Sequence, residues 1–241
     1  MATVHTLRLS RSNAYLVRGE RPILVDAGST GEADRILSAV RNKGVEPHTL
    51  ALILLTHGHL AVTGSSGEIR RRTGAPIAIH SFDAEMLRMG HNAPLRPTGF
   101  LARLAAPIVQ TGRGEPTNPD LILDGPRALK EFGVDGRVLE TPGHTSGSIS
   151  LVLPDGDALV GDLIMGGYLA GLVRRSVPNV AYFQEDDREA MRSVRIVLSS
   201  GARRLSRTRA SGEAAAKRAW LPARTRRSIL YHAWRRCIRS G

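Results

Sequence analysis

Two histidines separated by a single glycine, His57 and His59, follow an apolar run that ends at Thr56. The run begins at residue 50 with Leu-Ala-Leu-Ile-Leu-Leu and has the length of a buried strand bounded by a turn. Two imidazoles at positions i and i+2 of a strand-to-helix turn can point into one cavity, and neutral imidazole binds Zn²⁺ and similar ions. The spacing suggests the hypothesis that His57 and His59 share a metal ion, and further ligands elsewhere in the chain would support it.

The elements expected around this turn place it at the carboxyl end of a strand. Helices alternate with strands in this half, as is typical of the α/β class, whose open sheets carry their sites at the carboxyl ends of strands. The expected elements, in chain order, are strands at 4–9, 13–17 and 22–25, a helix over 31–43, a strand over 51–55, a helix over 67–72 and a strand over 76–79.

The remainder of the chain begins with a segment of different composition. Residues 89–119 are rich in glycine and proline, and a long segment of this kind is more often a functional cover than scaffold. We therefore predict a lid there. The elements expected after it are strands at 121–123, 137–139, 148–153 and 158–160, a helix over 184–200 and a strand over 202–205.

Three motifs, in this order, resemble those of the metallo-β-lactamase superfamily. Thr56, His57 and His59 match the start of that family's Thr-His-x-His-x-Asp-His pattern. Residues 140–148, Glu-Thr-Pro-Gly-His-Thr-Ser-Gly-Ser, resemble its Thr-Pro-Gly-His-Thr-x-Gly loop, and Gly161-Asp162 resembles its later Gly-Asp. The resemblance implies an α/β (α+β) fold, the αββα sandwich of the metallo-β-lactamase type, over residues 1–205.

The resemblance also implies a set of site residues. His57, His59 and His144 correspond to the three histidines of the family's first zinc site, and Asp162 corresponds to the carboxylate that binds or flanks the metals, which makes it the candidate catalytic group. Three imidazoles leave an open position on Zn²⁺, and such a zinc ion lowers the pKa of its water to about 7. Asp26, which also falls in a family-like position, either supports the site or binds neighbouring backbone N–H groups.

The second metal site of the family has no matching ligands. Ala61 and Val62 stand where the family has its Asp and third His, and Arg209 stands at the position of a late His. Alanine and valine have no lone pairs to donate, and a guanidinium stays protonated. We therefore expect one zinc ion rather than two, and impaired hydrolysis.

The positive charge is concentrated after residue 205. Residues 206–241 contain ten basic residues against one acidic residue, Glu213, and so account for +9 of the net charge of +12. One interpretation is a frameshift: permitted codons for residues 205–214, read one base later, spell Tyr-Pro-Gly-His-Gly, the late family motif that is missing here. The coding DNA decides this. The alternatives are a solvated or disordered basic extension, which we favour of the two, and a basic helix that binds nucleic acid or acidic lipid, with aromatic residues among its arginines.

Length and composition bound the remaining possibilities. The 241 residues contain no run long and apolar enough to span a membrane, no secretory signal is visible, and the one cysteine, Cys237, excludes an internal disulfide. We expect a cytoplasmic protein with a small-molecule substrate. The resemblance implies a metallo-hydrolase of the glyoxalase II-like group, acting on an ester, thioester or lactone. The alternative is an inactive family member with a binding role.

Overall fold

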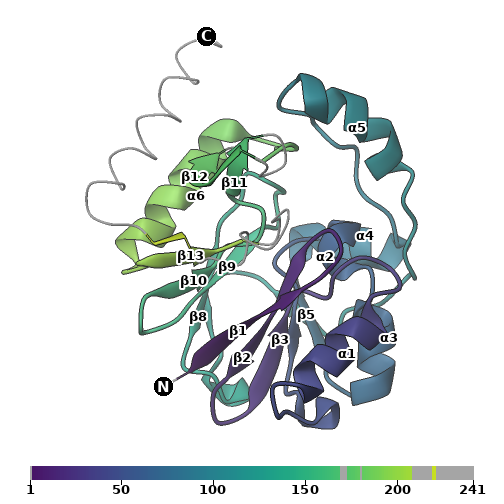
Figure 1. Cartoon of the computed structure of the whole chain (residues 1–241), viewed down its shortest axis with the longest axis vertical. Coiled ribbons are helices and arrows are strands. Elements are labelled where there is room, and N and C mark those ends of the chain that lie inside the picture. Colours follow the sequence, from purple (N-terminus) through teal and green to yellow (C-terminus); the bar gives the residue numbers. More distant parts are fainter. Residues whose placement is uncertain (1, 169–172, 180, 208–218, 221–241) are drawn as a thin grey trace.

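The structure is a computed structural model that describes residues 2–168, 173–179, 181–207 and 219–220. Two six-stranded sheets dominate the fold (Figure 1). The first sheet has the strand order β1 (Thr3–Arg8), β2 (Asn13–Arg18), β3 (Pro22–Val25), β4 (Ile53–Leu54), β5 (Ile77–His80) and β6 (Leu121–Leu123). The first three of these strands are antiparallel, and β3 to β6 run parallel.

The second sheet is built from the later part of the chain. Its strand order is β14 (Ala219–Trp220), β13 (Arg204–Ser206), β10 (Asp157–Leu159), β9 (Ile149–Val152), β8 (Arg137–Glu140) and β7 (Arg127–Ala128). The pairing is antiparallel except between β10 and β13, where it is parallel. A separate hairpin consists of β11 (Met165–Tyr168) and β12 (Val173–Asn179).

Helices cover the outer face of each sheet. Figure 1 shows α1 and α3 beside the first sheet and α6 beside the second. The helices are α1 (Ala33–Arg41), α2 (Leu60–Thr63), α3 (Ser66–Thr73), α4 (Ser81–Met89), α5 (Phe100–Gln110) and α6 (Asp187–Ser199), with 3₁₀ turns at Pro47–Thr49 and Lys130–Phe132. The resulting order of layers, helix, sheet, sheet and helix, confirms the predicted αββα sandwich.

The alternation of side chains along the strands explains why three apolar layers form. In β3, Leu24 packs against α1, whereas its neighbours Ile23 and Val25 pack between the two sheets. In β9, Leu151 lies between the sheets and Val152 faces α6. Both faces of β3 and β9 are therefore buried, which is why apolar residues predominate on both faces of these strands, with Ser150 as the polar exception in β9.

The segment 89–119, predicted as a lid, is closed at its base and contains α5. The backbone N–H of Gly114 donates to the carbonyl of Gly90 at 2.8 Å. Asn92 of the segment accepts at Oδ1 from the N–H of Leu60, at 2.9 Å. Thr98 of the segment donates its N–H to the carbonyl of Tyr182, also at 2.9 Å. The segment thus bonds to two distant parts of the chain. Its action as a lid remains a prediction.

The predicted elements occur within two or three residues of their expected bounds, but several further elements were not predicted. Helices α2, α4 and α5, strand β7 and the β11–β12 hairpin had no counterpart in the sequence analysis. The tail predicted over 206–241 lies largely outside the described residues, and the division between 1–205 and the tail stays a prediction. None of the helices in the described part of the chain has both the length and the apolar character that a bilayer-spanning segment needs.

Candidate metal centre

The turn that carries His57 and His59 follows β4 directly. Both side chains are buried, with 1% and 7% of their surface exposed. His59 is the N-cap residue of α2, so its backbone is extended where the helix begins. The two histidines therefore lie at the carboxyl end of a parallel strand, as the sequence predicted.

The loop that follows β8 carries His144, which is 3% exposed. This loop turns at Gly143, whose φ of +133° places it in a conformation that residues with a Cβ rarely adopt. A Cβ at this position would also lie 2.3 Å from the backbone nitrogen of Ala190 in α6. The glycine therefore allows the His144 loop to pack directly on α6.

The structure brings the three predicted histidines into one group. One ring nitrogen from each of His57, His59 and His144 lies within 4.8 Å of the corresponding atoms of the other two. Nδ1 of His59 and Nε2 of His144 are 3.0 Å apart although the residues are 85 positions apart in sequence. The three rings are mutually perpendicular, with centroids 4.6–5.1 Å apart. Three nitrogens converging from three directions suit an ion with an open tetrahedral position.

The hydrogen bonds of the outer ring nitrogens set the tautomers of two histidines. Nδ1 of His144 lies 2.7 Å from the carbonyl oxygen of Phe183, which can only accept, so this nitrogen carries the proton. Nδ1 of His57 lies 3.1 Å from Oγ1 of Thr56, whose own proton goes to a carboxylate. The Nε2 atoms of both rings therefore keep their lone pairs, which is the form that binds a metal ion. On this observation the three histidines fit a divalent metal.

Asp26 supports this arrangement from the end of β3. Its Oδ1 accepts from the backbone N–H of Thr56 and from Oγ1 of Thr56, both at 2.9 Å, and it is fully buried. Its backbone has a φ of +63°, which is uncommon for a residue other than glycine. The carboxylate therefore bonds to a backbone N–H and to the hydroxyl of the residue next to His57, so both interpretations of Asp26 apply.

Asp162, the predicted catalytic carboxylate, lies beside the histidines. It is 3% exposed, and its Oδ2 is 3.8 Å from Nε2 of His144. It follows β10, an inner strand of the second sheet, so the two sheets contribute to the same site. Its contact with a metal ion stays a prediction, since the group of converging ligand atoms consists of the three histidines.

The positions of the missing second-site ligands are also described. Ala61 and Val62 both lie in α2, immediately after His59. The side chain of Val62 is fully buried, and that of Ala61 is partly buried. The third such position, Arg209, lies outside the described residues. The turn of α2 beside the histidines thus presents aliphatic groups where a second metal would need donor atoms.

One carboxylate at this site was not predicted from the sequence. Asp83, in the first turn of α4, is 1% exposed and bonds to both histidine-bearing loops. Burial raises the pKa of Asp83, while the hydrogen bonds from Thr145, Gly58 and Gly147 act in the opposite direction. The sequence did contain a signal that could have identified Asp83: it is an acidic residue shortly after strand β5, at the same edge of the sheet as the histidine turn.

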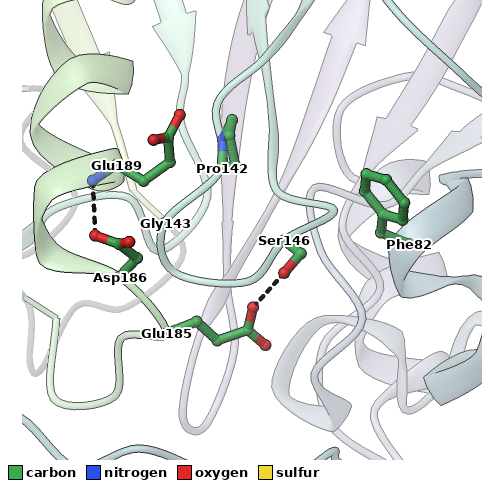
Figure 2. Close-up of a pocket in the computed structure, with 7 residues that line it drawn as sticks. All are labelled: Phe82, Pro142, Gly143, Ser146, Glu185, Asp186 and Glu189. Carbon is green, nitrogen blue, oxygen red and sulfur yellow. Dashed lines mark hydrogen bonds between the residues drawn. The ribbon is translucent and has the colours of Figure 1, made fainter.

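A cleft of about 330 Å³ borders the His144 loop (Figure 2). Pro142, Gly143 and Ser146 of the loop line it together with Phe82 and three acidic residues that precede or begin α6. The Oγ of Ser146 donates to Glu185 at 2.7 Å, and the N–H of Glu189 donates to Asp186 at 2.9 Å. The carboxylate of Glu185 thus holds the loop and that of Asp186 caps α6, whereas the carboxylate of Glu189 pairs with Arg192.

Comparison with known proteins assigns the family. The sequence pattern of the Metallo-beta-lactamase superfamily matches residues 7–206. The chain therefore belongs to this superfamily, a family of metal-dependent hydrolases, and the resemblance inferred from the motifs is confirmed.

Individual relatives agree with this assignment. The probable metallo-hydrolase YflN of Bacillus subtilis is 30% identical over 179 residues, which cover 67% of this chain and 64% of that protein. A hydroxyacylglutathione hydrolase of Cereibacter sphaeroides is 30% identical over 158 residues, covering 65% of this chain but only 49% of that enzyme. The crystal structure of TTHA1623 in a di-iron-bound form matches with a TM-score of 0.61 at 26% identity, covering 88% of this chain and 93% of that chain. The chain thus spans about two thirds of YflN and about half of the hydrolase.

Proposed function

We propose that this protein binds one divalent metal ion, zinc, through His57, His59 and His144 and slowly hydrolyses an ester, thioester or lactone. The observation that carries the proposal is the convergence of three buried imidazole nitrogens within 4.8 Å. Similarity to a hydroxyacylglutathione hydrolase supports a carbonyl substrate of the thioester class. The identity of the ion as zinc rests on the all-nitrogen ligand set, which suits Zn²⁺.

The residues of the chain divide the chemistry between them. When bound, a zinc ion in such a set supplies Lewis acidity and lowers the pKa of its water to about 7. Hydrogen bonds from Nδ1 of His57 and Nδ1 of His144 keep the opposite nitrogens of both rings unprotonated. Asp162 places a carboxylate oxygen 3.8 Å from Nε2 of His144, where it can accept a proton from a water molecule.

The expected activity is low because the site has few groups to orient a water molecule. In the sequence pattern of the family a carboxylate stands at position 61 and an imidazole at position 62. Ala61 and Val62 supply neither, and Val62 is fully buried. A single metal with one neighbouring carboxylate is therefore proposed here, in contrast to the two iron ions of the di-iron-bound form of TTHA1623.

The absence of donor atoms at Ala61 and Val62 also favours a second candidate function. An aliphatic α2 turn beside the three histidines is what a family member that has kept the fold and lost catalysis would show. In that case the protein binds a small ligand or a metal ion without turnover. Metal content and hydrolysis, measured together, separate the two candidates.

The test is elemental analysis of the purified protein for metal content per chain, with a His144→Ala variant as the control. About one zinc ion per chain, lost in the variant, supports the proposed site and leads to a screen of esters, thioesters and lactones. Zinc without turnover of any of them supports the binding role. Absence of metal from both proteins, after reconstitution with zinc, overturns the proposal.

A further inference from the structure

We propose that Asp83 is a positioning residue that sets the distance between the two histidine-bearing loops and thereby the affinity of the metal centre. The inference rests on the proposed metal site. It concerns a residue outside that set, contributed by a different element, α4. Asp83 touches none of the three histidine side chains in the hydrogen bonds described, so its effect is transmitted through the backbone of the loops.

The carboxylate of Asp83 divides its oxygens between the loops. Oδ2 accepts from the backbone N–H of Gly58, between His57 and His59, at 2.6 Å. The same oxygen accepts from Oγ1 of Thr145, the residue after His144, also at 2.6 Å. Oδ1 accepts from the N–H of Gly147 at 3.0 Å. One buried carboxylate thus joins two loops that are far apart in the sequence.

The packing around Asp83 shows that both loops are in close contact with it. A Cβ added to Gly147 would lie 2.6 Å from Cγ of Asp83, well inside van der Waals contact. A Cβ added to Gly58 would lie 3.1 Å from Cβ of Asp83 and 2.5 Å from Cε of Met86. Neither glycine has a positive φ, so the space next to Asp83 is what restricts these two positions.

The position of Asp83 is itself fixed by the scaffold. Helix α4 begins directly after β5, which pairs in parallel with β4, the strand that leads to His57. Ala84 and Leu87 of α4 are buried in the core beside the first sheet. Asp83 lies in the first turn of the helix, where the partial positive charge of the helix N-terminus favours an anion. The carboxylate is therefore a fixed point against which both loops are placed.

The geometry explains why an amide cannot replace this carboxylate. Gly58 and Gly147 each present a backbone N–H, which can only donate, to a different oxygen of Asp83. In Asp83→Asn one of these oxygens becomes an NH₂ group, so one N–H must face another donor. One loop then loses its bond, and the 3.0 Å approach between His59 and His144 is no longer held.

The experiment compares Asp83→Asn with a matched variant, Glu32→Gln. Glu32 is also a buried carboxylate that takes backbone N–H bonds from two segments, from Ser10 at 2.7 Å and from Ser29 at 2.8 Å. It contacts neither histidine loop in these bonds. Zinc affinity is measured by competition with a chromophoric chelator, thermal stability by calorimetry, and exchange of the Gly58 and Gly147 amide protons by NMR.

We expect Asp83→Asn to weaken zinc binding by about 10- to 100-fold, the range typical of groups that orient metal ligands. We expect Glu32→Gln to lower the melting temperature while leaving zinc affinity within about twofold of the parent protein. The amide of Gly58 or Gly147 should exchange faster in Asp83→Asn, and neither should in Glu32→Gln. If Asp83→Asn does not fold, Thr145→Val, which removes one donor of the three, should still weaken zinc binding severalfold.

Two results would overturn the inference. One is the case in which the two variants lose similar thermal stability and Asp83→Asn changes zinc affinity no more than Glu32→Gln does. Asp83 would then contribute to stability alone. The other is unchanged exchange at both glycine amides. If the parent protein binds no zinc, the proposed function fails, and the exchange measurement still decides whether Asp83 joins the two loops.

Discussion

The hydroxyl of Thr56 connects the buried carboxylate of Asp26 to the ring of His57, and the substitution Thr56→Val tests this link. Valine has nearly the same shape, so the change removes the hydroxyl without opening a cavity. In the structure Oγ1 of Thr56 lies 2.9 and 3.0 Å from the oxygens of Asp26 and 3.1 Å from Nδ1 of His57. Thr56 is 2% exposed, so water cannot readily replace these bonds.

The expected cost follows from these contacts. A hydrogen bond to an ionised group contributes about 1.5–3 kcal/mol, and loss of the acceptor for a buried N–H of His57 adds about 1 kcal/mol or more. We therefore expect Thr56→Val to lower the free energy of unfolding by about 3 kcal/mol at pH 7. For a domain of this size that corresponds to a fall in melting temperature of about 6–12 °C.

The assay is urea unfolding followed by circular dichroism, with Thr73→Val as the matched control. Thr73 is also buried, but its hydroxyl bonds only to neutral backbone groups, the carbonyl of Ile69 at 2.8 Å and the N–H of Ala75 at 3.2 Å. Its removal should cost about 1 kcal/mol. The reasoning is refuted if Thr56→Val costs no more than Thr73→Val, because the bond to Asp26 would then carry no charge-assisted strength.

Three further variants address the loops and the missing ligands. Backbone N–H groups of Glu189 and Arg188 hold the pKa of Asp186 below its usual range. The ionised Asp186 carboxylate therefore stabilises the fold above about pH 4, and this stabilisation is lost as the pH falls through the lower pKa of the folded state. Asp186→Asn should therefore lower stability by about 0.5 kcal/mol at pH 7, with the difference from the parent shrinking below about pH 4 in urea titrations. Gly143→Ala, which places a Cβ 2.3 Å from the nitrogen of Ala190, should lower the free energy of unfolding by about 3 kcal/mol or more; an unchanged urea midpoint would contradict the close packing. The double substitution Ala61→Asp and Val62→His should raise bound zinc above one ion per chain, and elemental analysis that still finds one would show that these positions do not limit metal content.

Patterns local in the sequence predicted the scaffold and the histidine group. Largely apolar runs of strand length located β3, β4 and β9, because both faces of these strands are buried and Ser150 of β9 is the one serine among them. Short motifs predicted that His57 and His144 lie at one site, and the structure places their ring centroids 4.6 Å apart. Metal binding by this group is a prediction still to be tested.

The features that escaped prediction depend on contacts between distant residues. In α4 the usual pattern is inverted, since Phe82 is 72% exposed while Asp83 is 1% exposed. Periodicity therefore gave no helical signal there, and the partners of Asp83 lie 25 to 64 residues away. Likewise, the hairpin of β11 and β12 contains paired glycines, paired arginines and a proline, which do not alternate as strand residues usually do.

The end of β13 has a consequence for the chain beyond it. The carbonyl oxygen of Arg207 accepts hydrogen bonds from the Nδ2 of Asn13, at 3.2 Å, and from the hydroxyl of Tyr15, whose pKa is raised by burial so that it remains a donor. This anchor uses the main chain, and every amino acid carries the same carbonyl group. The bonds to the carbonyl of residue 207 therefore do not depend on the side chain at that position, so we expect a change of reading frame or a fusion beyond 207 to leave this main-chain attachment in place.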